Sequence, residues 1–396
     1  MIPELRQRFN RDFTSGKYQK FLARLSAACG VPIEFRVSET PCFLPSALVR
    51  EMCDTGAELV RQLVDSAKYR KASDVTIPPE FHVPQEAALP MFVQVDFGLV
   101  RDASGTIRPK LVELQAFPSL YGYQPVVAEL YRESFGLPSD LDVFTGGLDE
   151  AAYWRLMRQV VVGAHAPEQV VLLEVDPEKQ KTLSDFKIHE QRLGIPTVNI
   201  RGVVKQGRKL HYVRNGRLVE IKRIYNRCIV DELVRKGIAL PFDLRDELDV
   251  EWAGHPNWYF RISKFSIPFL KHECVPKTWF LDEADGLPPD RENYLLKPLY
   301  SFAGVGIQFA PSDAEIAAIP HDQRHNYILQ ERVNFAPVIE TPHGGTQMEV
   351  RIMYVWPEGG ALTPVLPLLR MGRGKMMGVD HNKGLEWVGG SAGLIG

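Results

Sequence analysis

The sequence predicts a mixed α/β protein, because three kinds of local pattern occur in separate stretches of the chain. Apolar runs at 169–175 and 195–200 flank a polar helical stretch, and this order is typical of a βαβ unit with parallel strands. A hairpin is predicted across Asn215-Gly216, a dipeptide that favours a tight two-residue turn. Apolar residues recur at helical spacing over 48–64, which predicts an amphipathic helix against a core.

The length and composition are those of a globular protein with more than one packed module. At 396 residues the chain exceeds one ordinary core, so two or three modules are expected. A hydrophobic content of 45% and a charged content of 24% are enough to form buried cores with a polar surface. The net charge of −2 gives no argument for a nucleic-acid or membrane partner, and neither is expected.

The cysteines and the N-terminal stretch predict a cytoplasmic protein. The five cysteines form no CxxC pair, which favours reduced thiols over a disulfide framework or a zinc site. The N-terminal stretch is too polar for a signal peptide, and no apolar run approaches membrane-spanning length.

Two further strand-like runs, 91–100 and 107–117, are predicted to form a hairpin across a turn-rich link. Asp96 and Glu113 lie inside these otherwise apolar runs, which makes both carboxylates candidates for a functional site. The other expected elements are helices at 122–133, 149–162, 178–193, 260–270 and 313–319, and strands at 209–213, 217–224, 275–281, 327–333, 348–356 and 361–370.

Two stretches without a clear period are candidates for substrate contacts. The last residues, 371–396, are rich in glycine and charge, which predicts a functional loop region. Arg223, Tyr225 and Arg227 follow the Asn-Gly hairpin and could contact an anionic substrate, although a surface role fits them equally well.

The stretch 294–307 has the pattern of a strand, a glycine-bearing loop and a second strand. An apolar run ends at Lys297, Pro298 follows, and a turn with Gly304 and Gly306 leads into more apolar chain. Such a loop can lay backbone N–H groups over a polyphosphate while the lysine supplies positive charge. On its own, the pattern fits a hairpin with an exposed lysine equally well.

The neighbours of this stretch favour the phosphate interpretation. Lys264 precedes it, and the pair Gln330-Glu331 ends a strand that follows it at a similar interval. Lysines neutralise phosphates, the backbone around Gln330 can meet an adenine edge, and Glu331 can hold ribose hydroxyls. Each of these residues alone is more often a solvated surface group, but the ordered set predicts a nucleotide cleft.

This order of motifs resembles the ATP-grasp superfamily, in which a lysine-bearing strand, a glycine flap and an ILQE-like hinge follow one another. The segment 328–331 reads ILQE here. The segment 113–115 (ELQ), with a Ser- and Gly-bearing stretch after it, lies far upstream of the flap, as in the circularly permuted branch. That branch includes eukaryotic-type glutathione synthetase and the glutathionylspermidine synthetases. Further similar segments are 94–97 (QVDF), 368–370 (LLR) and 389–393 (GGSAG).

The resemblance implies a circularly permuted ATP-grasp fold with an additional Rossmann-like α/β module, and it implies ATP and Mg²⁺ as cofactors. It assigns phosphate contacts to Lys264, Lys297 and Arg351, of which Lys297 and Arg351 are the catalytic candidates. The remaining implied roles are nucleotide contacts for Ser301, Gly304, Gly306, Gln330 and Glu331, metal ligation for Glu113, Gln115 and Glu349, and substrate contacts for Asp96, Ser119, Arg370, Gly389 and Gly390.

The sequence departs from the glutathione synthetase pattern at the metal ligands and the flap. Gln115 stands where the family has asparagine, and Ser301 stands where it has a metal-binding glutamate. The triple glycine of the family's flap is missing as well. Glu349 or Asp380 could substitute for the lost carboxylate.

The implied organisation has three parts: helices and a metal-binding hairpin at 1–165, an α/β substrate-type module at 166–258, and a nucleotide-binding module at 259–396. The implied reaction is ATP-dependent amide formation between a carboxylate and an amine through an acylphosphate. The expected partners are small molecules, namely an amino acid, short peptide or polyamine, and the sequence leaves open whether the chain forms a homodimer. The alternative is a non-catalytic ATP-binding or regulatory protein of the same fold. A dehydrogenase built on the βαβ unit lacks the glycine fingerprint it would need.

Overall fold

The computed structural model describes residues 1–229, 233–234, 236–283, 288–299, 306–374, 376–378, 382 and 384–396. Ser301 and Gly304 of the predicted flap, and the alternative metal ligand Asp380, lie outside these residues. Within the described residues, no helix is both long and apolar enough to cross a lipid bilayer. The five cysteines are all buried and none forms a disulfide.

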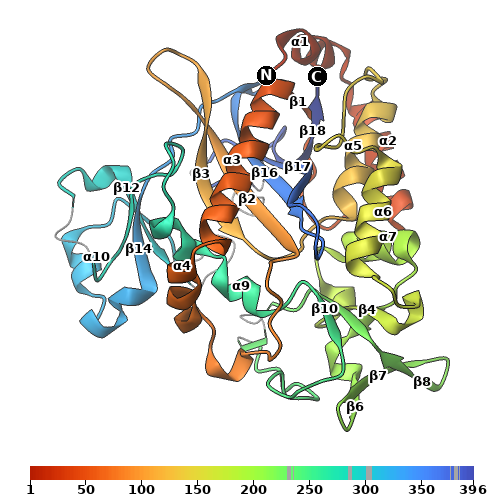
Figure 1. Cartoon of the computed structure of the whole chain (residues 1–396). Helices are drawn as coiled ribbons and strands as arrows, with labels where there is room; N and C mark the ends of the chain where they lie inside the picture. Colours follow the sequence, from red (N-terminus) through yellow and green to blue (C-terminus); the bar gives the residue numbers. More distant parts are fainter. Residues whose placement is uncertain are drawn as a thin grey trace.

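A large sheet in the middle of the molecule joins strands from both ends of the chain (Figure 1). The hairpin predicted at 91–117 is confirmed, because its two strands pair antiparallel at one edge of this sheet. Within the described residues the sheet has seven strands. In order they are β1 (Cys42–Leu44), β18 (Gly389–Ile395), β17 (Thr363–Gly372), β16 (Gly344–Val355), β2 (Phe92–Arg101) and β3 (Ile107–Gln115), with β15 (Ile339–Thr341) paired to β16.

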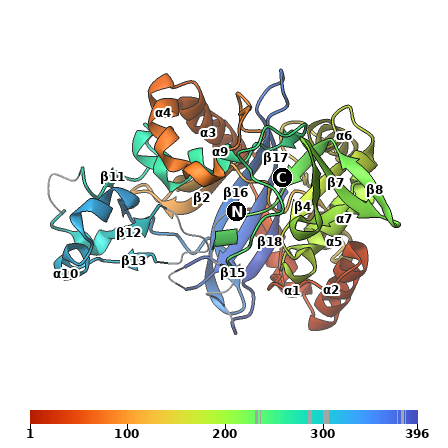
Figure 2. The same ribbon diagram turned by 90° about the horizontal axis from the view of Figure 1, so that it is seen from below.

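The two faces of this sheet are covered by different helices. The predicted amphipathic helix is α3 (Ser46–Val64), and it packs on the face formed by Val93, Val95, Val350 and Ile352. The opposite face is covered at one end by α5 (Tyr123–Ser134), which packs on β17 and β18. Helices α1 (Pro3–Asp12), α2 (Ser15–Cys29) and α6 (Glu150–Val161) complete this layer or flank it, whereas α4 (Ala67–Ala72) lies beside α3 (Figures 1 and 2).

A second, parallel sheet lies beside α6 and α7 (Leu183–Leu193), at the lower right of Figure 1. The predicted βαβ unit is confirmed: β4 (Val170–Glu174), α7 and β5 (Thr197–Asn199) follow one another, and the two strands pair in parallel. Asn215 and Gly216 have positive φ angles, as a tight two-residue hairpin turn requires. The remaining strands of this region are β9 (Arg223–Asn226) and β10 (Glu251–Ala253) in the parallel sheet, and β6 (Val204–Gln206), β7 (Lys209–Arg214) and β8 (Arg217–Ile221) in a small antiparallel one.

The third sheet forms a lobe of its own, at the left of Figures 1 and 2. The predicted strand that ends near Lys297 is confirmed as the central strand β12, and it pairs antiparallel with β14 and β13. In order the strands are β11 (Thr278–Phe280), β14 (Tyr327–Glu331), β12 (Tyr294–Pro298) and β13 (Gln308–Phe309), and α10 (Asp313–Ala317) packs beside them.

Two secondary-structure predictions are wrong. The last residues are not loop throughout, since β18 is inserted between β17 and β1. Its small residues permit this: a Cβ on Gly393 would lie 2.8 Å from Pro367 and 2.9 Å from Leu44. The helix predicted at 260–270 is instead the short α9 (Asn257–Arg261) and a 3₁₀ helix over Lys264–Phe269. The break occurs because Ser263 is extended and caps the second piece.

Candidate functional site

A cavity of about 220 Å³ lies where the central sheet, α9 and the β11–β14 lobe meet. One part of its wall is apolar, which suits a flat aromatic group. The other part is charged. The apolar wall is formed mainly by Leu295, Ile307, Phe309, Val333, Phe335, Met376 and Met377, and the polar wall by Glu113, Gln115, Ser263, Lys264, Lys297, Gln330, Arg332, Glu349 and Arg370.

Two buried lysines give the charged part of the cavity its positive potential. Lys264 and Lys297 are 7% and 5% exposed. Burial lowers the pKa of Lys297 to about 8, repulsion from Lys264 acts in the same direction, and Glu113 and Glu349 act against it. Among the described residues, no carboxylate lies within ion-pair distance of the Lys297 ammonium group. An anion placed between the two lysines would therefore be attracted strongly.

Gln330 contributes an unsatisfied amide to the same cavity. Its side chain is 1% exposed, and its Nε2 atom has no hydrogen-bond partner among the described residues. A buried donor without a partner is costly, and a ligand atom that accepts its hydrogen bond would remove that cost. Glu331 is not part of the cavity wall. Its carboxylate accepts from the backbone N–H of Lys277 at 3.2 Å, which fixes the edge of β14 against the chain before β11.

A cluster of opposite charges forms a floor beneath the cavity. Glu349 and Arg370 of this cluster line the cavity itself, whereas the predicted site residues Asp96 and Arg351 do not. Arg351 holds Asp96 in a two-pronged ion pair, with both N–O distances 2.6 Å. Arg370 donates to Asp96 at 2.6 Å and also to Glu349. Gln94 accepts from Arg351 at 3.0 Å, and the Gln115 oxygen accepts from the same guanidinium at 3.1 Å when its amide is oriented to satisfy the network.

The pKa values of the two carboxylates that pair with these arginines are shifted in opposite directions. Burial acts to raise the pKa of Asp96, but Arg351 and Arg370 outweigh it and hold the pKa of that carboxyl below its usual range. For Glu349 the balance is reversed. Burial, together with repulsion from Asp96 and Glu113, raises the pKa of Glu349 despite the nearby arginines. Asp96 is therefore a fixed negative charge, whereas Glu349 takes up a proton more readily than an ordinary glutamate.

Strand alternation explains why these side chains meet. Glu349 and Arg351 are two residues apart on β16 and so point to the same face. Asp96 lies opposite Arg351 on β2, and Arg370 lies opposite Glu349 on β17. Glu113 lies opposite Asp96 on β3, which completes a row of charges across the sheet. Val350, which lies between Glu349 and Arg351 on β16, is apolar and points to the opposite face, toward α3.

Gly98 on β2 lies against the apolar wall of the cavity, where a residue with a side chain would not fit. A Cβ at this position would lie 2.8 Å from the Phe335 ring and from Val333. Gly98→Ala is therefore expected to displace the apolar wall and destabilise the fold by about 1–3 kcal/mol, as overpacking does. Chemical denaturation measures the loss. The control is Gly202→Ala, at an exposed glycine where a Cβ meets nothing within 4 Å and φ lies outside the left-handed region, so this variant is expected to be nearly neutral. Equal losses for the two variants would contradict the close approach at Gly98.

The side-chain oxygen atoms at the polar end of the cavity partly fit the ligand shell of a magnesium ion. Magnesium prefers oxygen ligands and often takes only one or two carboxylates from a protein, with phosphates and water completing its shell. Glu113 faces the cavity, and Glu349 has one oxygen beyond the one that Arg370 occupies. The Gln115 oxygen is engaged by Arg351. The described residues contain no group of three acidic, His or Cys side chains placed to hold a metal by themselves.

Several predicted site residues lie outside the cavity wall. Ser119 contacts the charged cluster only through its backbone carbonyl, which accepts a hydrogen bond from Gln94 at 2.9 Å. Gly389 and Gly390 belong to β18, where Gly390 N–H donates to the Arg36 carbonyl at 2.8 Å. Gly306 has a φ of 77° and turns the chain into the wall residue Ile307.

Arg227 is a buried cation near the cavity that the sequence did not distinguish from its neighbours. It is 3% exposed, and its Nε and Nη1 atoms have no hydrogen-bond partner among the described residues. Its guanidinium lies 4.9 Å from the Phe117 ring centre, and Phe117 in turn packs on Tyr259 of the cavity wall at 5.7 Å. By contrast, the Arg223 guanidinium is occupied by Glu251 and by the carbonyls of Val160 and Val161.

The position of Arg227 in the fold is one where α/β proteins bind ligands. Arg227 directly follows β9, and β9 and β5 lie on opposite sides of β4 in the parallel sheet. The chain thus leaves β4 for one side and later returns to the other, and open α/β sheets commonly bind ligands at the carboxyl ends of the strands beside such a reversal. Guanidinium donors at such a place suit a carboxylate.

Comparison with known proteins supports the fold and leaves the activity open. No protein-family model matches this sequence, and no curated protein matches it either. Among solved structures, the chain is similar to a glutathione synthetase-like effector from Globodera pallida in its apo form, with 12% sequence identity and a TM-score of 0.61. The similarity covers 96% of each chain. The molecule is thus a mixed α/β protein with several sheets. More particularly, it has a glutathione synthetase-like fold.

Proposed function

We propose that this protein is an ATP-dependent carboxylate–amine ligase that forms an amide through an acylphosphate. The observation that carries the proposal is the cavity in which Lys264, Lys297 and Gln330 meet Glu113; within the described part of the chain, Nε2 of Gln330 has no hydrogen-bond partner. Two buried cations and an amide donor are the groups that the phosphates and base of a purine nucleotide would bind together.

In this proposal the nucleotide lies along the cavity from its apolar wall to its charged wall. The base occupies the space beside Phe309, Val333 and Met377, and it accepts a hydrogen bond from Gln330. The phosphates lie between Lys264 and Lys297, close to Arg370. Magnesium, held by Glu113 and the second oxygen of Glu349, neutralises the phosphate charge when bound.

The acid substrate binds at the carboxyl ends of the parallel strands, with Arg227 as its anchor. A second carboxylate on that substrate attacks the γ-phosphorus, and the β–γ bridging oxygen leaves with the bonding electrons as ADP. The amine then attacks the acyl carbon, phosphate leaves, and the amine nitrogen loses a proton. The chain aligns the reactants and balances their charge, and it supplies no covalent nucleophile.

Substrate-dependent release of ADP and phosphate tests the proposal. The full chain is incubated with MgATP and a panel of amino acids, short peptides and polyamines. At least one acid–amine pair is expected to give turnover, and Glu113→Gln is expected to lower that turnover at least about 100-fold because the magnesium ligand is lost. The matched control is Glu340→Gln, an exposed glutamate on β15, which is expected to keep the wild-type rate.

One observation favours a second candidate function, that of a non-catalytic ATP-binding protein. Arginines engage Gln115 and one oxygen of Glu349, two of the three predicted metal ligands. A protein that binds ATP without transferring its γ-phosphate needs fewer metal ligands. Saturable MgATP binding without turnover across the whole panel would support this candidate over the ligase.

A further inference from the structure

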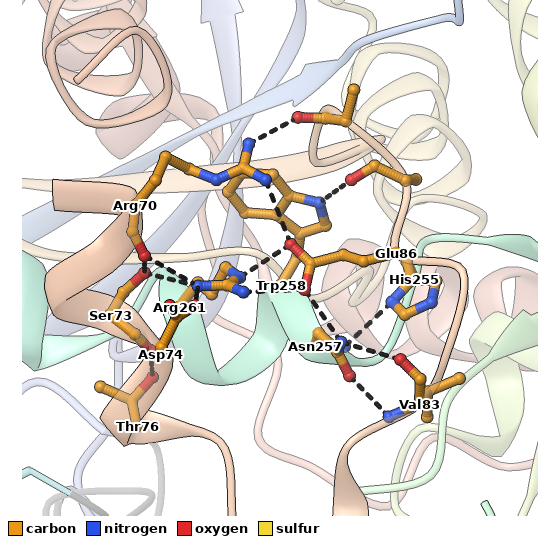
Figure 3. A network of polar contacts seen from close by, with 12 residues as sticks. Arg70, Ser73, Asp74, Thr76, Val83, Glu86, His255, Asn257, Trp258 and Arg261 are labelled. Carbon is orange, nitrogen blue, oxygen red and sulfur yellow. Dashed lines mark hydrogen bonds and ion pairs between the residues drawn. The ribbon is translucent and has the colours of Figure 1, made fainter. Parts of the chain in front are cut away.

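The short helix α9 and the residues after it separate two environments. Tyr259, Phe260 and the segment 262–264 line the cavity described above. Asn257, Trp258 and Arg261 point the other way, toward the chain between α4 and β2, where they enter a polar network (Figure 3). A five-residue helix cannot hold its own geometry in water, so these outside contacts determine where the cavity wall lies.

Arg261 is the centre of this network. Its guanidinium donates two parallel hydrogen bonds, of 2.7 and 3.0 Å, to the carboxylate of Glu86. Its Nη1 atom donates to Ser73 Oγ at 2.8 Å and to the Arg70 carbonyl at 3.1 Å, and it lies 2.8 Å from Asp74. Arg261 is only 6% exposed, and the charge-assisted bonds compensate for burial of its guanidinium.

Two neighbours of Arg261 on α9 complete the attachment. The Asn257 amide forms two 3.0 Å hydrogen bonds with the backbone of Val83, as a strand partner would, and also donates to Glu86 at 2.9 Å (Figure 3). Trp258 donates from its indole nitrogen to the Ala87 carbonyl at 2.9 Å. The segment 83–87 is thereby tied to three residues of the helix.

The network reaches Lys264 through the backbone. The Arg261 carbonyl accepts from the Tyr69 hydroxyl and from Ser266 Oγ, the latter at 3.4 Å. Ser266 Oγ in turn accepts from the Ser263 N–H at 3.1 Å, which closes the capping box before Lys264. The chain around Lys264 is thus fixed on both sides by contacts that begin at Arg261.

We propose that Arg261 is a positioning residue that holds Lys264 at the phosphate end of the cavity, an inference that rests on the proposed ATP site. Arg261 itself does not line the cavity and does not touch the nucleotide. It acts by fixing the turn between α9 and the following 3₁₀ helix, so that the Lys264 ammonium group meets the phosphates in one place. Arg261→Lys would keep the positive charge but lose the two parallel donors that bind both carboxylate oxygens of Glu86.

A double-mutant cycle between Arg261 and Lys264 tests this inference by calorimetric titration with MgATP. Arg261→Lys is expected to weaken binding about tenfold in the wild-type chain, because a charged phosphate contact is misplaced. In a chain that carries Lys264→Met, the same change is expected to alter the affinity less than about twofold, because the group that Arg261 positions is gone. Equal losses in the two backgrounds would overturn the inference.

The matched control is Arg223→Lys. Arg223 is also a buried arginine that binds one glutamate and two backbone carbonyls, but, unlike Arg261, it has no chain neighbours that line the cavity. Arg223→Lys is expected to lower stability to a similar degree and to leave MgATP affinity within about twofold of wild type. If the wild-type chain does not bind MgATP at all, the proposed function fails; if it binds and Arg261→Lys has no effect, only the positioning role fails.

Discussion

Replacement of Lys297 by methionine is expected to abolish nucleotide binding while it stabilises the ligand-free protein. The ammonium group is buried, and burial lowers the pKa of Lys297 from 10.5 to about 8. That lowering corresponds to about 3 kcal/mol of destabilisation when the group is charged in the folded state. Methionine has a similar length and no charge, so the apo protein is expected to gain about 1–3 kcal/mol while MgATP affinity falls at least about 100-fold.

The stability gain is expected to depend on pH in a defined direction. Below about pH 8, Lys297 is protonated in both the folded and unfolded states, so the full cost of burial is present. Between about pH 8 and 10.5 the unfolded chain binds more protons than the folded chain, and wild-type stability rises with pH. The advantage of Lys297→Met is therefore largest below about pH 8 and disappears toward pH 10.5.

Chemical denaturation across this pH range and calorimetric titration with MgATP measure the two effects. The control is Lys110→Met, on β3 beside the site, where the half-buried lysine donates to the Glu273 carbonyl at 2.6 Å. That variant is expected to keep the wild-type affinity. Unchanged affinity in Lys297→Met would refute the role of Lys297 in phosphate binding, and a loss of apo stability would show that its charge is not a burden to the fold.

Removal of the Arg351 guanidinium is expected to produce the largest loss of stability. Asp96 is completely buried, and Arg351 supplies two of its ion-pair contacts. Arg351→Ala leaves that carboxylate with Arg370 as its remaining cationic partner. Loss of one partner from a buried ion pair costs about 3–5 kcal/mol, and chemical denaturation near neutral pH is expected to report a loss of that size.

The control is Arg24→Ala, which removes an arginine that pairs with Glu133 at 2.5 Å on the surface. Exposed pairs of this kind contribute less than about 1 kcal/mol, so Arg24→Ala is expected to be nearly neutral. An Arg351→Ala variant as stable as Arg24→Ala would show that the charged floor of the cavity is not required for the fold.

Local patterns in the sequence were sufficient to predict most of the elements. The βαβ unit at β4–α7–β5, the hairpin at Asn215-Gly216 and the alternation of β16 depend on neighbouring residues, and all three are present. The same local patterns identified Lys264, Lys297 and Gln330, and the fold brings these three side chains to one cavity. Their roles in nucleotide binding stay predictions.

Contacts between distant parts of the chain could not be read from local patterns. Arg351 and Asp96 are 255 residues apart, and Arg261 and Glu86 are 175 apart, so their pairing depends on the topology of the sheets. The strand β18 has too much glycine to show a strand period, and it is stabilised by partners on both sides. Arg227 was one of two similar arginines, and only packing shows which one has guanidinium atoms without a hydrogen-bond partner among the described residues.

Calorimetric titration of MgATP into the full-length wild-type protein near neutral pH tests the central claim most directly. The cavity with its two buried lysines predicts saturable binding at a single site, with ADP also bound and adenosine bound far more weakly because it lacks phosphates. A folded protein that gives no saturable heat with MgATP, or binds adenosine as tightly as ATP, would contradict the claim that Lys264 and Lys297 form a phosphate site.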